Sequence, residues 1–161
     1  MSEKKRKVLT LCIALSDGKI LLALKKRGFG SGRWNGFGGK VEEGETIEKS
    51  AIRETKEEGC IEIEKMEKYA LHEFEFVGDP VLLEVHVFKI LAFSGTPTET
   101  EEMAPRWFDF DDIPYETMWP DDRHWLPLFI EGKKTVNRFL FDTSSGTERI
   151  VEKSVQVVPK L

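Results

Sequence analysis

The sequence predicts one domain of mixed α and β structure, in which helices and a mixed sheet share one core. Pairs of apolar, strand-like runs are separated by short turn sequences, and helix-forming segments lie between these pairs. Strand and helix do not alternate regularly, as they would in a parallel βαβ fold. A chain of 161 residues buries about two thirds of its unfolded surface in a single core. We therefore expect one domain over residues 1–161.

The first half of the chain predicts a hairpin, a loop and a helix. Residues 8–14 and 19–24 are apolar runs separated by the turn sequence Ser-Asp-Gly, which predicts two strands joined by a tight turn. The glycine-rich segment from Gly28 to Gly39 is too irregular for a helix or a long strand. Residues 46–58 are strong helix formers without glycine or proline. They predict a helix.

The second half predicts two further hairpins with a helix between them. Residues 61–76 and 81–93 read as strands on either side of a turn that contains glycine and proline. A helix is expected to begin near Asp121, which follows a proline. Residues 135–142 and 148–157 then predict a final hairpin.

Composition excludes several classes of protein. A net charge of −5 argues against binding of duplex nucleic acid, which requires clustered Lys and Arg. No apolar run approaches the roughly 20 residues of a membrane helix. Cys12 and Cys60 are too few for a disulfide framework, so we expect reduced thiols and a cytoplasmic protein. The basic run at residues 4–7 favours a solvated terminus; the alternative is a nuclear address. A mitochondrial location is a further alternative.

Three glutamates on the predicted helix are the main chemical signal. Glu54, Glu57 and Glu58 stand at i, i+3 and i+4, so their side chains share one helix face. This face overlaps the apolar stripe that includes Ala51, and buried carboxylates are costly without a cation. Oxygen ligands of this kind suit a hard divalent cation such as magnesium. The alternative from spacing alone is a solvated acidic helix face.

The segment from Gly39 to Ile61 resembles the Nudix box, G-x5-E-x7-R-E-U-x-E-E-x-G-U, where U is apolar. The matching residues are Gly39, Glu45, Arg53, Glu54, Glu57, Glu58 and Ile61. Thr55 replaces an apolar residue, and Cys60 stands where glycine is expected. A left-handed helix cap costs a non-glycine residue roughly 1–2 kcal/mol. The helix is therefore expected to end one residue early, on Gly59, which would move Glu58.

The resemblance implies a Nudix-type α/β/α sandwich with a loop–helix–loop catalytic motif and a divalent cofactor, Mg²⁺ or alternatively Mn²⁺. The implied metal ligands are Gly38, Glu54, Glu57, Glu58 and Glu102. The cations would bridge the phosphates and activate the attacking water. Arg53 and Glu45 would brace the motif by a salt bridge, and Lys40 would contact a phosphate oxygen.

Beyond the box, segments such as KKRGFGSGRWNGFGGKVEEGETIE, FEFVGDP and MWPDD resemble the animal-type enzymes that hydrolyse oxidised purine nucleoside triphosphates. The implied substrate-binding residues are Thr10, Lys25, Phe29, Asn35, Phe37, Gly38, Gly39, Lys40, Phe74, Leu83, Trp119, Asp121 and Asp122. In this resemblance Trp119 stacks on the base and Asn35 hydrogen-bonds its edge. Leu83 departs from the methionine expected there.

Asp121 and Asp122 are adjacent carboxylates in a partly apolar site, which resist double ionisation. One of them would stay protonated and act as a donor to a purine edge. The alternative is that Asp caps a helix and Trp119 is simply buried. His72, His86 and His124 lack metal-ligand spacing, so we expect structural roles for them.

The resulting prediction is a monomeric enzyme that converts oxidised purine nucleoside triphosphates such as 8-oxo-dGTP and 2-oxo-dATP to the monophosphate and pyrophosphate. The partner is a small nucleotide, with no membrane involved. One alternative keeps the box but acts on another nucleotide diphosphate substrate. A second is a nucleotide-binding module whose turnover is weakened by Cys60.

Overall fold

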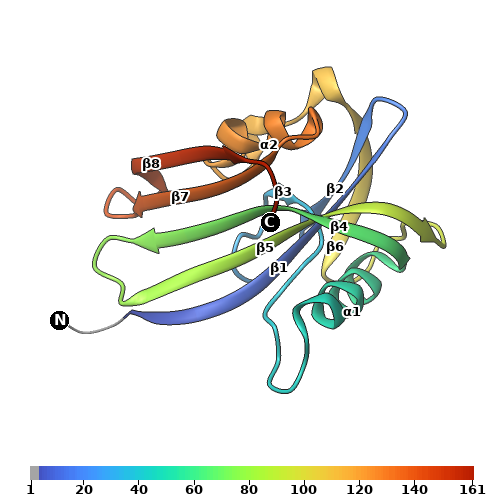
Figure 1. Ribbon diagram of the computed structural model, residues 1–161, viewed down its shortest axis with the longest axis horizontal. Helices are drawn as coiled ribbons and strands as arrows, with labels where there is room; N and C mark the ends of the chain where they lie inside the picture. The colour runs from blue at the N-terminus through green and yellow to red at the C-terminus, as the bar shows by residue number, and fades with distance from the viewer. Residues whose placement is uncertain (1–3) are drawn as a thin grey trace.

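A computed structural model describes residues 4–161 and shows a mixed eight-stranded sheet between two α-helices (Figure 1). In chain order the elements are β1 (Lys5–Ser16), β2 (Lys19–Lys25), β3 (Trp34–Asn35), α1 (Ile47–Gly59), β4 (Glu62–Phe76), β5 (Val81–Ser94), β6 (Met103–Asp109), the 3-10 turns η1 (Phe110–Asp112) and η2 (Tyr115–Thr117), α2 (Asp122–Ile130), β7 (Lys134–Asp142) and β8 (Arg149–Val158). The strands pair in the order β3-β2-β1-β5-β4-β7-β8, and β6 pairs with β2. The predicted mixed fold is confirmed.

The three predicted hairpins are present. Strands β1 and β2 pair antiparallel next to a turn in which Asp17 and Gly18 both have positive φ. Strands β4 and β5, and β7 and β8, also pair antiparallel. Two parallel pairs, β1 with β5 and β4 with β7, join the hairpins into one mixed sheet.

The sheet separates two apolar layers because successive strand residues point to opposite faces. On β1, Cys12 and Ala14 belong to the layer that contains Ala51 of α1. Leu11 and Ile13 belong to the other layer, with Trp125 and further apolar residues of α2. The two helices therefore cover opposite faces, as Figure 1 shows. This is the predicted α/β/α sandwich.

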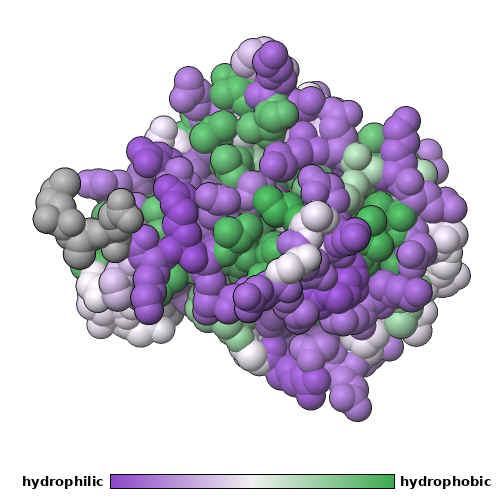
Figure 2. All heavy atoms as spheres, turned by 60° about the horizontal axis from the view of Figure 1, so that its bottom comes forward, coloured by the Kyte–Doolittle hydropathy of each residue, from purple (hydrophilic) through white to green (hydrophobic). Residues whose placement is uncertain are grey.

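The face on which α1 comes forward is mostly polar. Figure 2 shows hydrophilic residues over most of this face, with apolar patches between them. Glu48, Lys49 and Lys56 of α1 are exposed, as expected for a helix that buries only one side. Within residues 4–161, neither helix has the length and apolar character needed to cross a bilayer.

Strand β6 is absent from the sequence prediction. Pro105 lies inside it, and proline removes a donor from the strand ladder. The residue is accommodated because β6 pairs only with β2 and is therefore an edge strand. The basic run also differs from expectation. Residues 5–7 are part of β1, where Lys5 pairs with Val81, and do not form a free terminus.

The last residue of α1 is Gly59, as the sequence predicted, but the left-handed cap conformation falls on Cys60 and not on Gly59. Thr46 caps its start by accepting from the Lys49 N–H at 3.1 Å. At the other end Gly59 is still helical, and Cys60 takes the left-handed conformation with φ 61° and ψ 26°. The Cys60 N–H donates to the Lys56 carbonyl at 3.0 Å. Glu58 therefore keeps its place in a regular helix.

Candidate active site

A cavity opens on the α2 side of the sheet, between the glycine-rich loop and the start of α2. Its lining residues are Leu9, Thr10, Leu11, Lys25, Phe29, Gly30, Asn35, Gly36, Gly38, Gly39, Glu58, His72, Phe74, Phe76, Leu83, Val85, Met103, Trp119, Asp121, Asp122 and Phe141. They come from strands far apart in sequence. The lining includes residues of the glycine-rich loop and Glu58 of α1 as well as Trp119, Asp121 and Asp122 at the start of α2. A single cavity thus joins a carboxylate helix to an aromatic pocket.

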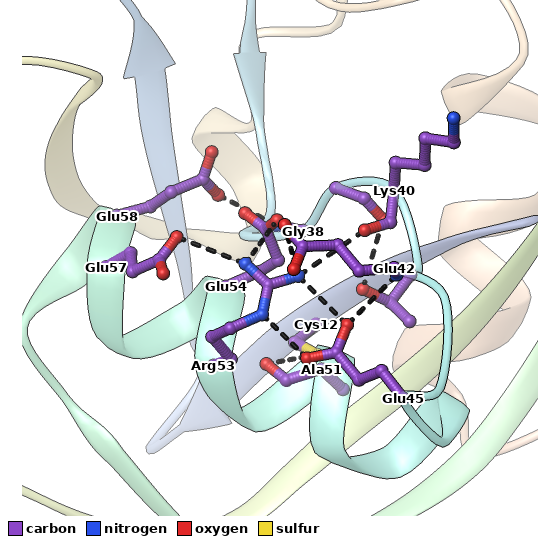
Figure 3. A network of polar contacts seen from close by, with 12 residues as sticks. Cys12, Gly38, Lys40, Glu42, Glu45, Ala51, Arg53, Glu54, Glu57 and Glu58 are labelled. Atoms are coloured by element: carbon purple, nitrogen blue, oxygen red, sulfur yellow. Dashed lines mark hydrogen bonds and ion pairs between the residues drawn. The ribbon is translucent and has the colours of Figure 1, made fainter.

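Among the expected substrate-binding residues, Phe37 and Lys40 do not line this cavity, and of the expected metal ligands Gly38 and Glu58 line it whereas Glu54, Glu57 and Glu102 do not. Phe37 is buried in the opposite layer under α1, where its N–H donates to the Cys12 carbonyl at 3.0 Å. Lys40 is exposed, and Figure 3 shows its Nζ directed away from the carboxylates. Neither side chain is part of the cavity wall. Phe37 supports the helix instead.

Sequence reasoning missed nine lining residues: Leu9, Leu11, Gly30, Gly36, His72, Phe76, Val85, Met103 and Phe141. His72 and Phe76 could have been found, because they flank Phe74 at the period of two that marks one face of a strand. Phe141 comes from β7, which reaches the site only through its parallel pairing with β4. No local signal in the sequence reveals that pairing.

Arg53 is the hub of the carboxylate network on α1 (Figure 3). Its Nε lies 2.7 Å from Glu45 Oε2, and its Nη1 lies 3.0 Å from Glu54 Oε1 and 3.2 Å from Glu57 Oε2. Hydrogen bonding to Arg53 lowers the pKa of Glu45 to about 2, and the same contact raises the pKa of Arg53. Arg53 therefore stays charged and ties the loop to the helix.

Glu54 and Glu58 are the carboxylates most affected by burial. Burial raises the pKa of Glu54, and Arg53 opposes this shift. Burial also raises the pKa of Glu58 to about 7, while the Gly38 N–H, which donates to Glu58 Oε1 at 2.8 Å, opposes it. The negative charges of Glu54 and Glu102 raise the pKa of Glu58 further. The carboxyl groups of Glu54 and Glu58 are thus gathered in a part of the site that is shielded from solvent.

Two glycines allow the loop to approach these groups. A Cβ on Gly38 would lie 1.8 Å from the Thr10 carbonyl oxygen, and a Cβ on Gly39 would lie 2.6 Å from the Glu54 Cδ. Real Cβ atoms do not approach other atoms so closely. The close packing of the backbone on β1 therefore requires glycine at position 38, whereas a side chain at position 39 would force the end of the Glu54 side chain to move.

The expected metal ligands are not gathered into a ready ligand cluster. Among residues 4–161, no three side chains of His, Cys, Asp or Glu are grouped so as to hold a metal ion. Arg53 lies between Glu54 and Glu57, and Arg27 Nη2 pairs with Glu102 at 2.5 Å. The residues nevertheless fit a divalent cation, because burial raises the pKa of Glu58 and, despite Arg53, that of Glu54, so a cation would stabilise their charged forms.

The Asp121–Asp122 pair lines the same cavity as Glu58. Both residues are only 3% exposed. Burial raises the pKa of Asp121 to about 6, and burial together with the charge of Asp121 raises the pKa of Asp122 well above its ordinary value. Within the described chain Asp122 Oδ2 has no hydrogen-bond partner. Burial and mutual repulsion therefore favour retention of a proton by the pair.

The alternative that an Asp simply caps α2 is wrong. Asp121 precedes the helix but makes no side-chain capping hydrogen bond. Its Oδ2 instead accepts from Trp125 Nε1 at 2.9 Å. Trp119 is not buried in the core but lines the cavity, with the Phe29 ring 5.1 Å from its own. These side chains face the site.

The fold and the site together define an α/β/α sandwich in which a glycine-rich loop and a glutamate-bearing helix close one end of an aromatic cavity. The chain belongs to the Nudix family, because the NUDIX domain model matches residues 4–129.

Similar proteins support this assignment. The chain is 52% identical to the oxidized purine nucleoside triphosphate hydrolase of Mus musculus, over 82% of this chain and 85% of that protein. It is 44% identical to the protein of the same name from Danio rerio, over 96% and 97%. The fold is similar to that of a MutT protein from Bacillus halodurans, with a TM-score of 0.75 and 21% identity over 93% of this chain and 97% of that one.

Proposed function

We propose that this protein hydrolyses oxidised purine nucleoside triphosphates, such as 8-oxo-dGTP and 2-oxo-dATP, to the monophosphate and pyrophosphate. The observation that carries the proposal is that one cavity is lined both by the Asp121–Asp122 pair and by Gly38, Gly39 and Glu58. A base-reading end and a phosphate-directed end are thus continuous. The names of the mouse and zebrafish relatives point to the same substrates.

The base-reading end offers hydrogen-bond donors and acceptors to a flat heterocycle. A protonated Asp122 donates from its O–H and accepts at its other oxygen, so the pair can read keto or amino edges. Asn35 Oδ1 accepts from the Gly36 N–H at 2.8 Å, which leaves its Nδ2 to donate into the cavity. Trp119 supplies a stacking surface, a contribution of about 1–3 kcal/mol per base.

The phosphate end would hold Mg²⁺, or alternatively Mn²⁺, through Glu54, Glu57, Glu58, Glu102 and the backbone of Gly38. When bound, the metal supplies charge neutralisation for the phosphates and activation of water. Glu58 is oriented by the Gly38 N–H, and Arg53 with Glu45 fixes the loop against the helix. Lys25 lines the same cavity and brings a positive charge to it. The Lys40 side chain, in an extended conformation, would reach a phosphate only from outside the cavity.

We also propose that residues 1–161 form a single Nudix domain that acts as a cytoplasmic monomer. One sheet spans the described chain, and both cysteines are free, which fits a reducing compartment. Light scattering of the purified protein tests the monomer directly.

The first experiment measures pyrophosphate release from 8-oxo-dGTP, 2-oxo-dATP and dGTP, with magnesium and with EDTA, for wild type and Glu58→Gln. Glu48→Gln is a matched control, because Glu48 is an exposed glutamate on the same helix without an ion pair in the described chain. We expect an oxidised-base preference that EDTA and Glu58→Gln abolish and Glu48→Gln preserves. Metal-dependent cleavage without this preference indicates another nucleotide substrate, and binding without turnover indicates a binding module.

A further inference from the structure

Trp119 is supported by a residue that does not itself line the cavity. The guanidinium carbon of Arg33 lies 4.2 Å from the centroid of the Trp119 ring, which is a cation–π contact. Trp119 is among the lining residues of the cavity, whereas Arg33 is not. Gly30 approaches the same ring, since a Cβ there would lie 3.3 Å from Trp119 Nε1. The loop that carries Arg33 therefore supports the indole from outside the site.

Arg33 is in turn held by the C-terminal hairpin. Its Nη2 lies 2.6 Å from Glu148 Oε2, in the segment between β7 and β8 and 115 residues away in sequence. The two side chains are only 24% and 23% exposed, so this pair is better shielded than an ordinary surface ion pair. In the described chain Glu148 is the only carboxylate within ion-pair distance of Arg33. The other guanidinium nitrogen, Nη1, is buried without a partner.

Arg33 also interacts electrostatically with the Asp121–Asp122 pair, because its charge lowers the pKa of both carboxyls. Two sets of anions thus compete for one guanidinium. Contact with Glu148 keeps Arg33 over the Trp119 ring. Without that contact, attraction to the Asp pair would draw the guanidinium away from the ring and toward the base-reading carboxyls.

We propose that Glu148, acting through Arg33, positions Trp119 for base stacking, so that the β7–β8 hairpin is part of the base-recognition apparatus. Glu148 is a positioning residue, since it touches neither the cavity nor the carboxylate helix. Phe141 of β7 lines the cavity and lies 6.1 Å from Trp119 between ring centroids, so the hairpin reaches this wall at two points. The proposal rests on the proposed function of the same cavity.

The test variant is Glu148→Gln, which keeps the shape of the side chain and removes its charge. We expect the KM for 8-oxo-dGTP to rise about fivefold, because a partly shielded cation–π contact is lost. The value of kcat should stay within about twofold of wild type, because the carboxylate helix is untouched. Glu152→Gln is the matched control, since Glu152 is an exposed glutamate on β8 with no ion pair in the described chain. It should leave KM unchanged.

Two further measurements separate positioning from a general loss of stability. In an Arg33→Met background, Glu148→Gln should raise KM no further, because it acts only through Arg33. The alkaline limb of the pH profile of kcat/KM should also move to lower pH in Glu148→Gln, since Arg33 shifts toward the Asp pair. An additive effect of the two substitutions, or an unchanged KM in folded Glu148→Gln, overturns the proposal.

Binding of 8-oxo-dGMP in EDTA, measured by calorimetry, reads the base site without turnover. If the wild type binds 8-oxo-dGMP and Glu148→Gln binds it about fivefold more weakly, the proposal is supported. If both proteins bind 8-oxo-dGMP equally well, the proposal is refuted, but the proposed function is not. If the wild type binds neither 8-oxo-dGMP nor dGMP, the proposed function itself fails.

Discussion

A Cβ atom on Gly59 would lie 2.6 Å from Cζ of Phe37, so the last residue of α1 packs directly on that buried ring. This contact explains why glycine stands at position 59, where the conformation is still helical. The left-handed position is one residue later and is taken by Cys60, with φ 61°. The chain therefore uses its glycine for close packing and accepts strain at the cap.

Cys60→Gly is predicted to stabilise the protein. Relief of the left-handed strain stabilises the fold by roughly 1–2 kcal/mol. The greater backbone entropy of glycine in the unfolded chain opposes this by roughly 0.5–1 kcal/mol. We expect a net gain of about 0.5–1 kcal/mol in the free energy of unfolding by urea, with activity unchanged. Cys60→Ala keeps the strain and is the control. An equal gain from alanine would show that the thiol, and not the backbone, is responsible.

Gly38→Ala and Gly39→Ala are predicted to fail in different ways. The added methyl group at residue 39 would meet the end of the Glu54 side chain, which can move, whereas at residue 38 it would meet the Thr10 backbone. Gly39→Ala should keep its Tm and lose roughly 10- to 100-fold in kcat, as when a metal-site support is removed. Gly38→Ala should lower the Tm. Thermal melts with pyrophosphate assays separate the two, and a large drop in Tm for Gly39→Ala would contradict this account.

The pKa shifts of the Asp pair predict a pH dependence for base binding. Asp122 has a raised pKa, so it is protonated below that pKa and loses its proton, and its donor, as the pH rises through it. Wild-type kcat/KM should therefore fall on the alkaline side. Asp122→Asn keeps a donor and an acceptor at every pH, so it should retain activity within a few-fold near neutrality and flatten the alkaline limb. Asp122→Ala should lose about 1–3 kcal/mol of binding.

Profiles of kcat/KM over a wide pH range check this, because the raised pKa values of the pair determine where the alkaline limb falls. Glu152→Gln again serves as a charge control. The same alkaline limb in Asp122→Asn and wild type would show that another group sets it.

Local patterns were sufficient to predict the hairpins and α1, because turn residues and periodicity act over a few neighbours. The segment from Gly39 to Ile61 likewise located the carboxylate network. Long-range pairing was not accessible: β6 was hidden by Pro105, and Phe141 reaches the cavity only through β7 and β4. The resemblance predicted that Phe37 lies in the pocket. Its side chain instead lies in the opposite apolar layer, because successive residues of this part of the loop alternate in direction as they do in a strand.

His72 shows how a residue expected to be structural acquires a measurable role. It is fully buried, with Nδ1 3.0 Å from Asn137 Nδ2, and burial lowers its pKa to about 3 from an ordinary value of 6.5. As the pH falls below 6.5, the unfolded chain binds a proton on this imidazole and the folded chain does not. The free energy of unfolding must then decrease with falling pH, until the pH approaches 3.

We therefore predict that His72→Leu reduces the acid sensitivity of the fold. Between pH 7.5 and pH 5, the free energy of unfolding of the wild type should fall by about 2 kcal/mol more than that of the variant, because of this one group. This difference does not depend on how stable each protein is at pH 7.5. Urea unfolding at both pH values measures the two differences. His124→Leu is the control: its pKa is also lowered, but it is less buried, so its effect should be smaller. Equal losses in wild type and His72→Leu would mean that the imidazole is protonated in the folded protein, which its burial among Phe74, Trp125 and Phe139 makes costly.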